Sequence, residues 1–121
     1  MSGSGDSRDE AGESTIQVIE APDESTVAVT GRITVDSSPQ LRVALLQLLR
    51  RSKAPAVVID FSAVSYVDMS GIATLIEGLK PARERSITLR LVGMGGQVKA
   101  LAEVAQLDKI FHLWGSEVES T

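Results

Sequence analysis

Residues able to do chemistry are concentrated in the segment 57–72, VVIDFSAVSYVDMSGI. We expect an apolar strand to end at Asp60, and after a short connection Asp68-Met69-Ser70-Gly71 opens a helix. A serine at a helix start faces free backbone N–H groups and the positive end of the helix dipole, which together stabilise an anion. Phosphorylation there would add about −1.5 to −2 charges at pH 7. Ser70 is therefore a candidate phosphorylation site, although spacing alone favours a simple N-cap contributing about 1 kcal/mol.

Three other chemistries fit the residues poorly. Asp60 could suggest a receiver domain, but receivers hold Mg²⁺ with an acidic pair after the first strand, and here that strand ends at Glu20 beside Pro22. A serine hydrolase needs a base near Ser70, whereas the one histidine, His112, lies far along the chain and is expected at the surface. The glycines at 93–96 lack the rest of a dinucleotide or P-loop motif and indicate a turn.

Composition narrows the possible functions further. The chain has 121 residues, no cysteine and 43% hydrophobic residues, which is enough for one core. A net charge of −4 and 3% aromatic residues do not favour nucleic-acid binding, and no apolar run approaches the roughly 20 residues of a membrane span. We therefore expect a soluble cytoplasmic domain that is not an enzyme, needs no metal or cofactor and does not insert into a membrane.

The chain divides into two parts. Residues 1–14 are rich in glycine, serine and acidic side chains and have nothing to bury, so a disordered tail is expected. Residues 15–121 are expected to form one domain.

The apolar pattern of that domain predicts alternating strands and helices. Two strands, roughly 15–20 and 26–31, form a hairpin, and a helix follows from Ser37-Ser38-Pro39, with serine as its cap. The continuous apolar run 56–59 indicates a central strand covered on both faces. A second helix starts near Ser70 and ends or kinks at Pro81.

A strand over 87–92 and a third helix, with its apolar stripe between 98 and 105, complete the alternation. The apolar residues at 110–114 suggest a last short strand. Right-handed crossovers then predict an α/β fold: a mixed sheet of four to five strands, with the hairpin first and parallel strands after it, and amphipathic helices packed on it.

The segment Val67-Asp68-Met69-Ser70-Gly71-Ile72 after a VVIDFS strand resembles the STAS domain, specifically the bacterial anti-sigma-factor antagonists. The resemblance covers roughly residues 15–114. It implies that Ser70 is the phosphorylated residue and that Asp68 and Gly71 support the acceptor loop. Many antagonists carry a second serine where Met69 stands, and the family usually continues into a C-terminal helix where this chain ends in GSEVEST.

A further departure concerns the turn after the second strand. Gly-Glu-Leu-Asp in the family corresponds to residues 31–34, Gly-Arg-Ile-Thr, so Thr34, or Asp36 nearby, stands for the acidic residue that lines the acceptor pocket. Met69, Ile72, Thr34 and Asp36 are the expected partner contacts.

The resemblance implies a switch in transcription control. Unphosphorylated, the protein would bind an anti-sigma factor that is also a serine kinase; phosphorylation of Ser70 would release it, and a PP2C-type phosphatase would restore the active form. Two alternatives stay open: an accessory subunit of an ABC (lipid) transporter, whose corresponding string tends to be Asp-Thr-Ala-Gly, and a stress-signalling scaffold.

Overall fold

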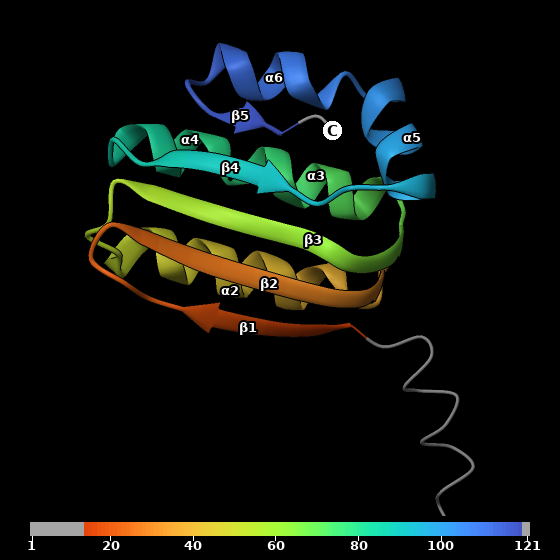
Figure 1. Cartoon of the computed structure of the whole chain (residues 1–121), viewed down its shortest axis with the longest axis horizontal. Coiled ribbons are helices and arrows are strands. Elements are labelled where there is room, and N and C mark those ends of the chain that lie inside the picture. Colours follow the sequence, from red (N-terminus) through yellow and green to blue (C-terminus); the bar gives the residue numbers. More distant parts are fainter. Residues whose placement is uncertain (1–13, 120–121) are drawn as a thin grey trace, which may run out of the picture.

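The computed structural model describes residues 14–119 and contains one mixed sheet, on which the helices pack (Figure 1). Nearly all of the expected N-terminal tail lies outside this range. The strands are β1 (Thr15–Ile19), β2 (Glu24–Ile33), β3 (Ala56–Val67), β4 (Thr88–Val92) and β5 (Glu117–Val118). Their spatial order is β1-β2-β3-β4-β5; β1 and β2 are antiparallel and every later pair is parallel. The predicted α/β fold class, with a hairpin followed by parallel strands, is confirmed.

The helices lie on one face of this sheet. They are α2 (Ser38–Arg51), α3 (Met69–Glu77), α4 (Leu79–Glu84), α5 (Gly96–Val104) and α6 (Leu107–Leu113). Because each parallel strand is added beside the previous one in the same direction, right-handed crossovers place every connection on the same side. Figure 1 shows α2, α3 and α4 together behind the sheet. A row in register across all five strands faces these helices: Val18, Val27, Ile59, Leu91 and Val118.

The prediction that β3 is covered on both faces is therefore wrong. The next residues along the strands, which include Thr26, Val58 and Arg90, are also in register with one another. Their side chains point to the opposite face of the sheet, which none of the described helices covers. Arg90 stands in the middle of that face and forms ion pairs with Glu24 and two other glutamates at 3.3–3.4 Å. Val58 is only 9% exposed because neighbouring side chains on the sheet shield it.

Strand β3 is much longer than its apolar run predicts. It continues past Asp60 to Val67 because β2 extends beside it, with register shifts between Ala28 and Thr30 and between Gly31 and Arg32. Asp60 does not end the strand; its carboxylate accepts a hydrogen bond from the Ser62 N–H at 2.9 Å. The long strand carries the chain to the turn where α3 begins.

The helix boundaries follow partly from the predicted signals. α2 begins at Ser38 as expected, but Ser37 does not cap it; its hydroxyl donates to the carbonyl of Arg32 and accepts from the N–H of Thr34, both at 2.9 Å. The second helix breaks at Gly78 into α3 and α4, as Pro81 predicts, since proline cannot donate to the carbonyl four residues back.

The last part of the domain differs from the prediction. Residues 107–113 form helix α6, not a strand, with Leu107 and Phe111 buried one turn apart. The final strand is β5, which follows a left-handed turn at Gly115 and pairs with β4. Within the described residues, no helix has both the length and the apolar content needed to cross a bilayer.

Candidate functional site

The candidate site is the turn between the carboxyl end of β3 and the first turn of α3. Asp68 is the N-cap of α3, with an extended backbone, and Ser70 is the second residue of the helix. The alternative interpretation of Ser70 as the cap is therefore wrong. Ser70 is half-buried, so the residue lies neither in the core nor fully in solvent.

Asp68 binds Ser70 through both side chain and backbone. Oδ1 of Asp68 accepts hydrogen bonds from the Ser70 hydroxyl at 2.5 Å, from the Ser70 N–H at 2.9 Å and from the Gly71 N–H at 3.4 Å. The sequence suggests that the N–H groups at this helix end are free to bind an anion. In the structure, the Asp68 carboxylate already accepts hydrogen bonds from two of them. It also fixes the direction of the hydroxyl.

These contacts lower the pKa of Asp68. The largest cause is the hydrogen bond from the Ser70 hydroxyl; backbone N–H groups of Ser70, Gly71 and Val35 act in the same direction, and partial desolvation opposes them. Each of these donors stabilises the ionised carboxylate. Asp68 is therefore a charged acceptor at neutral pH.

The second oxygen of Asp68 links this turn to the loop between β2 and α2. Oδ2 accepts from the N–H of Val35 at 3.1 Å, and the backbone N–H of Asp68 donates to the carbonyl of Ile33 at 3.0 Å. Thr34 and Asp36 belong to the same loop, where the Asp36 N–H donates to the Thr34 hydroxyl at 3.2 Å. The structure therefore brings together Ser70, Asp68 and the loop that holds Thr34 and Asp36.

Two predicted site residues are buried. Ile72 is 0% exposed and belongs to the core, because the first turn of α3 directs it toward the sheet, so it is not available to a partner. Gly71 is buried, and a Cβ there would lie 2.4 Å from Cγ2 of Val67 and 3.0 Å from Cγ2 of Ile33. Glycine at this position permits α3 to approach the strands closely, and its support of the acceptor loop stays a prediction.

Exposed apolar side chains stand on both of the segments that Asp68 joins. Met69, which precedes Ser70, is 55% exposed, and Val35 is 67% exposed. The side chain of Met69 is therefore accessible, and its contact with a partner stays a prediction. Val35 was not among the candidate residues, because nothing local in the sequence reveals that its loop lies against Asp68.

Gln97 is a second residue that sequence reasoning missed. From the first turn of α5, its amide nitrogen donates to the carbonyl of Val67 at 2.8 Å, and its amide oxygen accepts from the N–H of Val67 at 3.0 Å. No sequence signal could have identified this contact, since the two residues are 30 positions apart.

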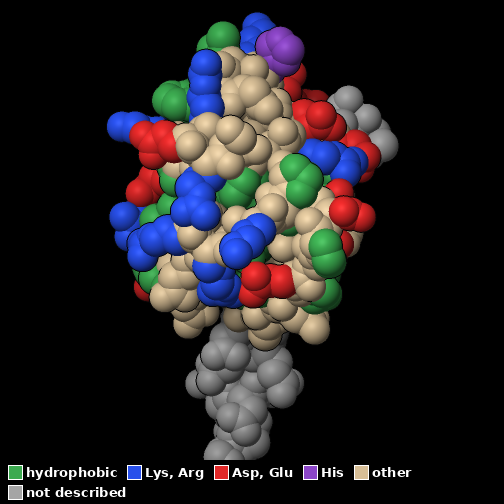
Figure 2. Space-filling model, turned by 90° about the vertical axis from the view of Figure 1, so that its left-hand side faces the viewer, with side chains coloured by type: hydrophobic (Ala, Val, Ile, Leu, Met, Phe, Trp, Pro, Cys, Tyr) green, Lys and Arg blue, Asp and Glu red, His purple; other side chains and the backbone are tan. Residues whose placement is uncertain are grey.

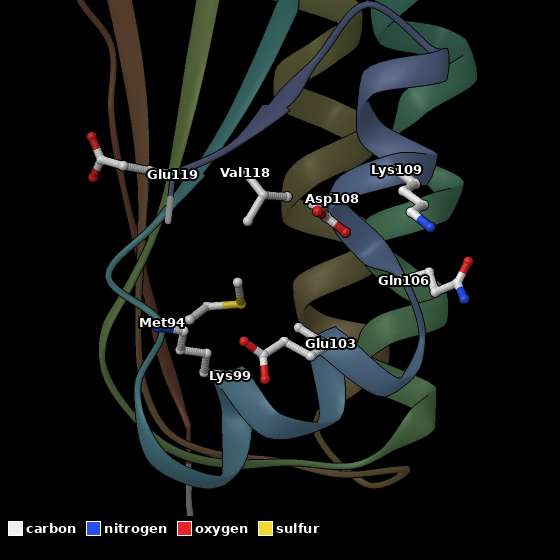
Figure 3. A pocket seen from close by; sticks show the side chains of 9 residues that line it. Met94, Lys99, Glu103, Gln106, Asp108, Lys109, Val118 and Glu119 are labelled. Carbon is white, nitrogen blue, oxygen red and sulfur yellow. The ribbon is translucent and has the colours of Figure 1, made fainter. Parts of the chain in front are cut away.

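The cavities lie elsewhere. One, of about 330 Å³, is bounded by α5, α6 and the β5 region (Figure 3). Met94 and Val118 give it apolar walls, and charged side chains such as Lys109 and Glu103 surround it. Ser70 does not line this cavity.

Basic side chains gather at the opposite end of the domain, where the parallel strands begin (Figure 2). Arg50 and Arg51 occupy the last turn of α2, where positive charge complements the helix dipole, and Lys53 follows them. Arg51 forms an ion pair with Glu20 at 3.0 Å. These residues share no contact with the Ser70 turn.

Known proteins with similar sequences and structures are described mainly as anti-sigma-factor antagonists. An anti-sigma-B factor antagonist of Listeria monocytogenes is 27% identical over 97 residues, which cover 80% of this chain and 84% of that protein. The structure of an anti-sigma factor antagonist from Mycobacterium paratuberculosis has a TM-score of 0.72 and 24% identity, covering 90% of this chain and 87% of that one.

The same fold also occurs inside a transporter. The murine Slc26a9 anion transporter superposes with a TM-score of 0.65 and 18% identity over 82% of this chain, which corresponds to 16% of the transporter. The family model described as "Mlab, STAS domain" matches residues 16–114, and this chain therefore belongs to the STAS domain family.

Proposed function

We propose that this protein is a phospho-switchable anti-sigma-factor antagonist, a binding protein in the cytoplasm rather than an enzyme. It binds an anti-sigma factor with serine kinase activity while Ser70 is unmodified, and it releases that partner once Ser70 is phosphorylated. The observation that carries the proposal is the hydroxyl of the half-buried Ser70, oriented by Asp68 in a turn where Met69, the preceding residue, is exposed. The antagonist relatives support the same role.

The binding surface in this proposal consists of the loop 34–37 and the turn 68–70. Asp68 joins the two, because one oxygen binds the Val35 N–H and the other binds Ser70. The apolar side chains of Val35 and Met69 would be buried by the partner, and Thr34 and Asp36 would form the polar rim. Such an arrangement, with apolar groups at the centre and polar groups around them, is typical of protein interfaces.

Phosphoryl transfer would alter this surface directly. The Ser70 oxygen forms a bond to the γ-phosphorus of ATP, the bond to the leaving ADP breaks, and the hydroxyl proton is released. The hydrogen bond from the hydroxyl to Asp68 is then lost, since its proton is gone. A phosphate with about −1.5 to −2 charges now lies beside the Asp68 carboxylate, and like charges at this distance repel.

The repulsion favours displacement of Asp68. The phosphate can accept hydrogen bonds from the N–H groups of Ser70 and Gly71 in place of the carboxylate, as anions do at helix starts. Once Asp68 moves, Val35 loses its hydrogen bond and the loop 34–37 is no longer joined to the turn. Phosphorylation would therefore weaken binding twice, through an uncompensated charge in the interface and through loss of the link between its two segments.

Retention of a candidate anti-sigma factor by immobilised protein tests this proposal. Wild type and Ser70→Ala are expected to retain it, and Ser70→Asp to lose at least tenfold in affinity. Ser62→Ala, a change at an exposed serine on β3, is the matched control and should behave as wild type. Mass mapping after incubation with the kinase and ATP should place phosphate on the peptide that contains Ser70. Equal retention by all variants, with no phosphate on that peptide, would refute the switch.

Co-purification from the native host distinguishes the alternatives. A soluble ATP-binding kinase is the partner that the proposal requires, and a phosphatase of the PP2C type should then remove the phosphate. An ATPase recovered with membrane subunits would instead indicate the transporter accessory role, for which the fold of Slc26a9 is a precedent. A megadalton particle would indicate the stress-signalling scaffold.

A further inference from the structure

The side chain of Gln97 takes the place of a neighbouring strand beside Val67. Its amide makes both hydrogen bonds that a neighbouring strand would make there, donating to the Val67 carbonyl at 2.8 Å and accepting from the Val67 N–H at 3.0 Å. A primary amide has the same donor and acceptor as a peptide group, which makes it suited to this substitution.

The need for this substitute arises because β3 is longer than β4. β4 pairs with β3 only from Ala56 to Asp60 and leaves the sheet at Gly93, whereas β2 accompanies β3 as far as Val67. The N–H of Asp68 points toward β2 and donates to Ile33. Successive peptide groups of a strand point to opposite sides, so the polar backbone groups of Val67 face the side that β4 has left.

Val67 in turn determines the geometry of the acceptor turn. It directly precedes Asp68, whose carboxylate holds the Ser70 hydroxyl, and its side chain is 0% exposed. Gly71 lies so close to it that a Cβ at that position would fall 2.4 Å from the Val67 side chain. A shift of Val67 would therefore move both the cap residue and the first turn of α3.

We infer that Gln97 is a positioning residue for the Ser70 turn: by pairing with the backbone of Val67, it holds Asp68 and Ser70 in the geometry that presents the hydroxyl. The inference depends on the proposed function only for the role of Ser70. Helix α5 thereby becomes part of the acceptor site.

Amide hydrogen exchange measured by NMR tests the pairing itself. Gln97→Ala should lower the protection of the Val67 amide at least tenfold, while the amide of Ile59 in the paired part of β3 keeps its protection. Gln47→Ala, a change at an exposed glutamine of α2, is the matched control and should alter neither amide. Unchanged protection of Val67 in Gln97→Ala would overturn the inference.

Positioning requires a second readout, which is the pH titration of the Ser70 amide proton. This proton is bonded to Asp68 and reports its ionisation. In Gln97→Ala the turn loosens, so the midpoint should rise toward the ordinary value for aspartate. Loss of Val67 protection with the wild-type midpoint retained would mean that Gln97 only completes the sheet, and the positioning role would be refuted.

Gln97→Glu provides a conditional rescue. An ionised carboxylate can still accept from the Val67 N–H, but it cannot donate to the Val67 carbonyl and its second oxygen repels that carbonyl. The pairing, and with it the protection of the Val67 amide, should therefore weaken at pH 7. A protonated carboxyl has one donor and one acceptor and imitates the amide, so protection relative to wild type should return below about pH 4, near the ordinary pKa of glutamate. Protection that stays low at acid pH would contradict the inference. If wild type accepts no phosphate, the proposed function fails, and these NMR measurements still decide the role of Gln97.

Discussion

Asp68 and Ser70 form a closed pair at the start of α3, in which one carboxylate oxygen accepts both the hydroxyl and the backbone N–H of the serine. The cap that starts the helix is therefore also the group that orients the candidate phosphate acceptor. Any change to one function of Asp68 should alter the other, and the two can be measured separately.

Loss of the cap should destabilise the fold. Asp68→Ala removes the acceptor for the N–H groups of Ser70 and Gly71, and substitution of an N-cap by alanine typically costs about 1 kcal/mol. Urea unfolding should show this decrease in the free energy of unfolding. Asp36→Ala, in the adjacent loop, makes a matched control, because the Asp36 side chain is exposed and should change stability by less than about 0.5 kcal/mol. Equal effects of the two substitutions would contradict the capping role.

The ionisation of Asp68 should depend on the Ser70 hydroxyl. That hydroxyl is the largest cause of the lowered pKa of Asp68, so Ser70→Ala should raise this pKa toward its ordinary value of 3.8. The carboxyl carbon of Asp68, followed by NMR over acid pH, measures the change directly. A pKa that stays at its wild-type position in Ser70→Ala would show that the backbone donors alone lower it.

The same shift makes stability depend on pH. Because folding lowers the pKa of Asp68, its ionised form contributes stability that is fully present above the unfolded pKa, near 3.8, and is lost as pH falls through the folded pKa. The difference in unfolding free energy between wild type and Asp68→Asn should therefore be constant from pH 7 to about pH 5 and shrink below about pH 4. A difference that persists unchanged at the lowest pH would contradict this linkage.

Close approach of α3 to the strands should make Gly71 intolerant of a side chain. Gly71→Ala adds a Cβ that would lie 2.4 Å from Val67 and 3.0 Å from Ile33, and such overpacking typically costs about 1–3 kcal/mol. Gly95→Ala is the control, since a Cβ there meets nothing within 4 Å. Thermal unfolding should show a lower midpoint for the first variant only; two indistinguishable midpoints would disprove the steric account.

Local patterns predicted most of the fold. The order of strands and helices up to α5 and the break before Pro81 follow from residues within a few positions of one another. The length of β3 could not be predicted from such local patterns, because β3 pairs with β2 beside it and with Gln97 at Val67. Helix α6 was missed because its apolar residues were assigned to a strand, although Leu107 and Phe111 have the spacing of a helix turn.

The binding surface shows the same limit. Met69 and Ile72 were both expected to contact the partner, yet the apolar stripe of α3 already places Ile72 with Leu75 on the buried side. Helical geometry thus argued against Ile72 where the family resemblance suggested it. Val35 is linked to the turn through a hydrogen bond from its backbone N–H to Asp68, a contact between residues 33 positions apart that no local pattern reveals.

Met69 and Ile72 should consequently differ in which property they control. Met69→Ala removes a 55% exposed side chain and should leave the free energy of unfolding within about 0.5 kcal/mol of wild type, while a candidate anti-sigma factor binds it more weakly by roughly tenfold, as for an apolar contact at the centre of an interface. Ile72→Ala removes a fully buried side chain and should cost about 2–5 kcal/mol in stability. Urea unfolding and a binding titration on each variant measure both properties. Met69→Ala that binds as wild type would exclude this face of the α3 turn from the contact surface, because Met69 is the most exposed apolar side chain on that turn.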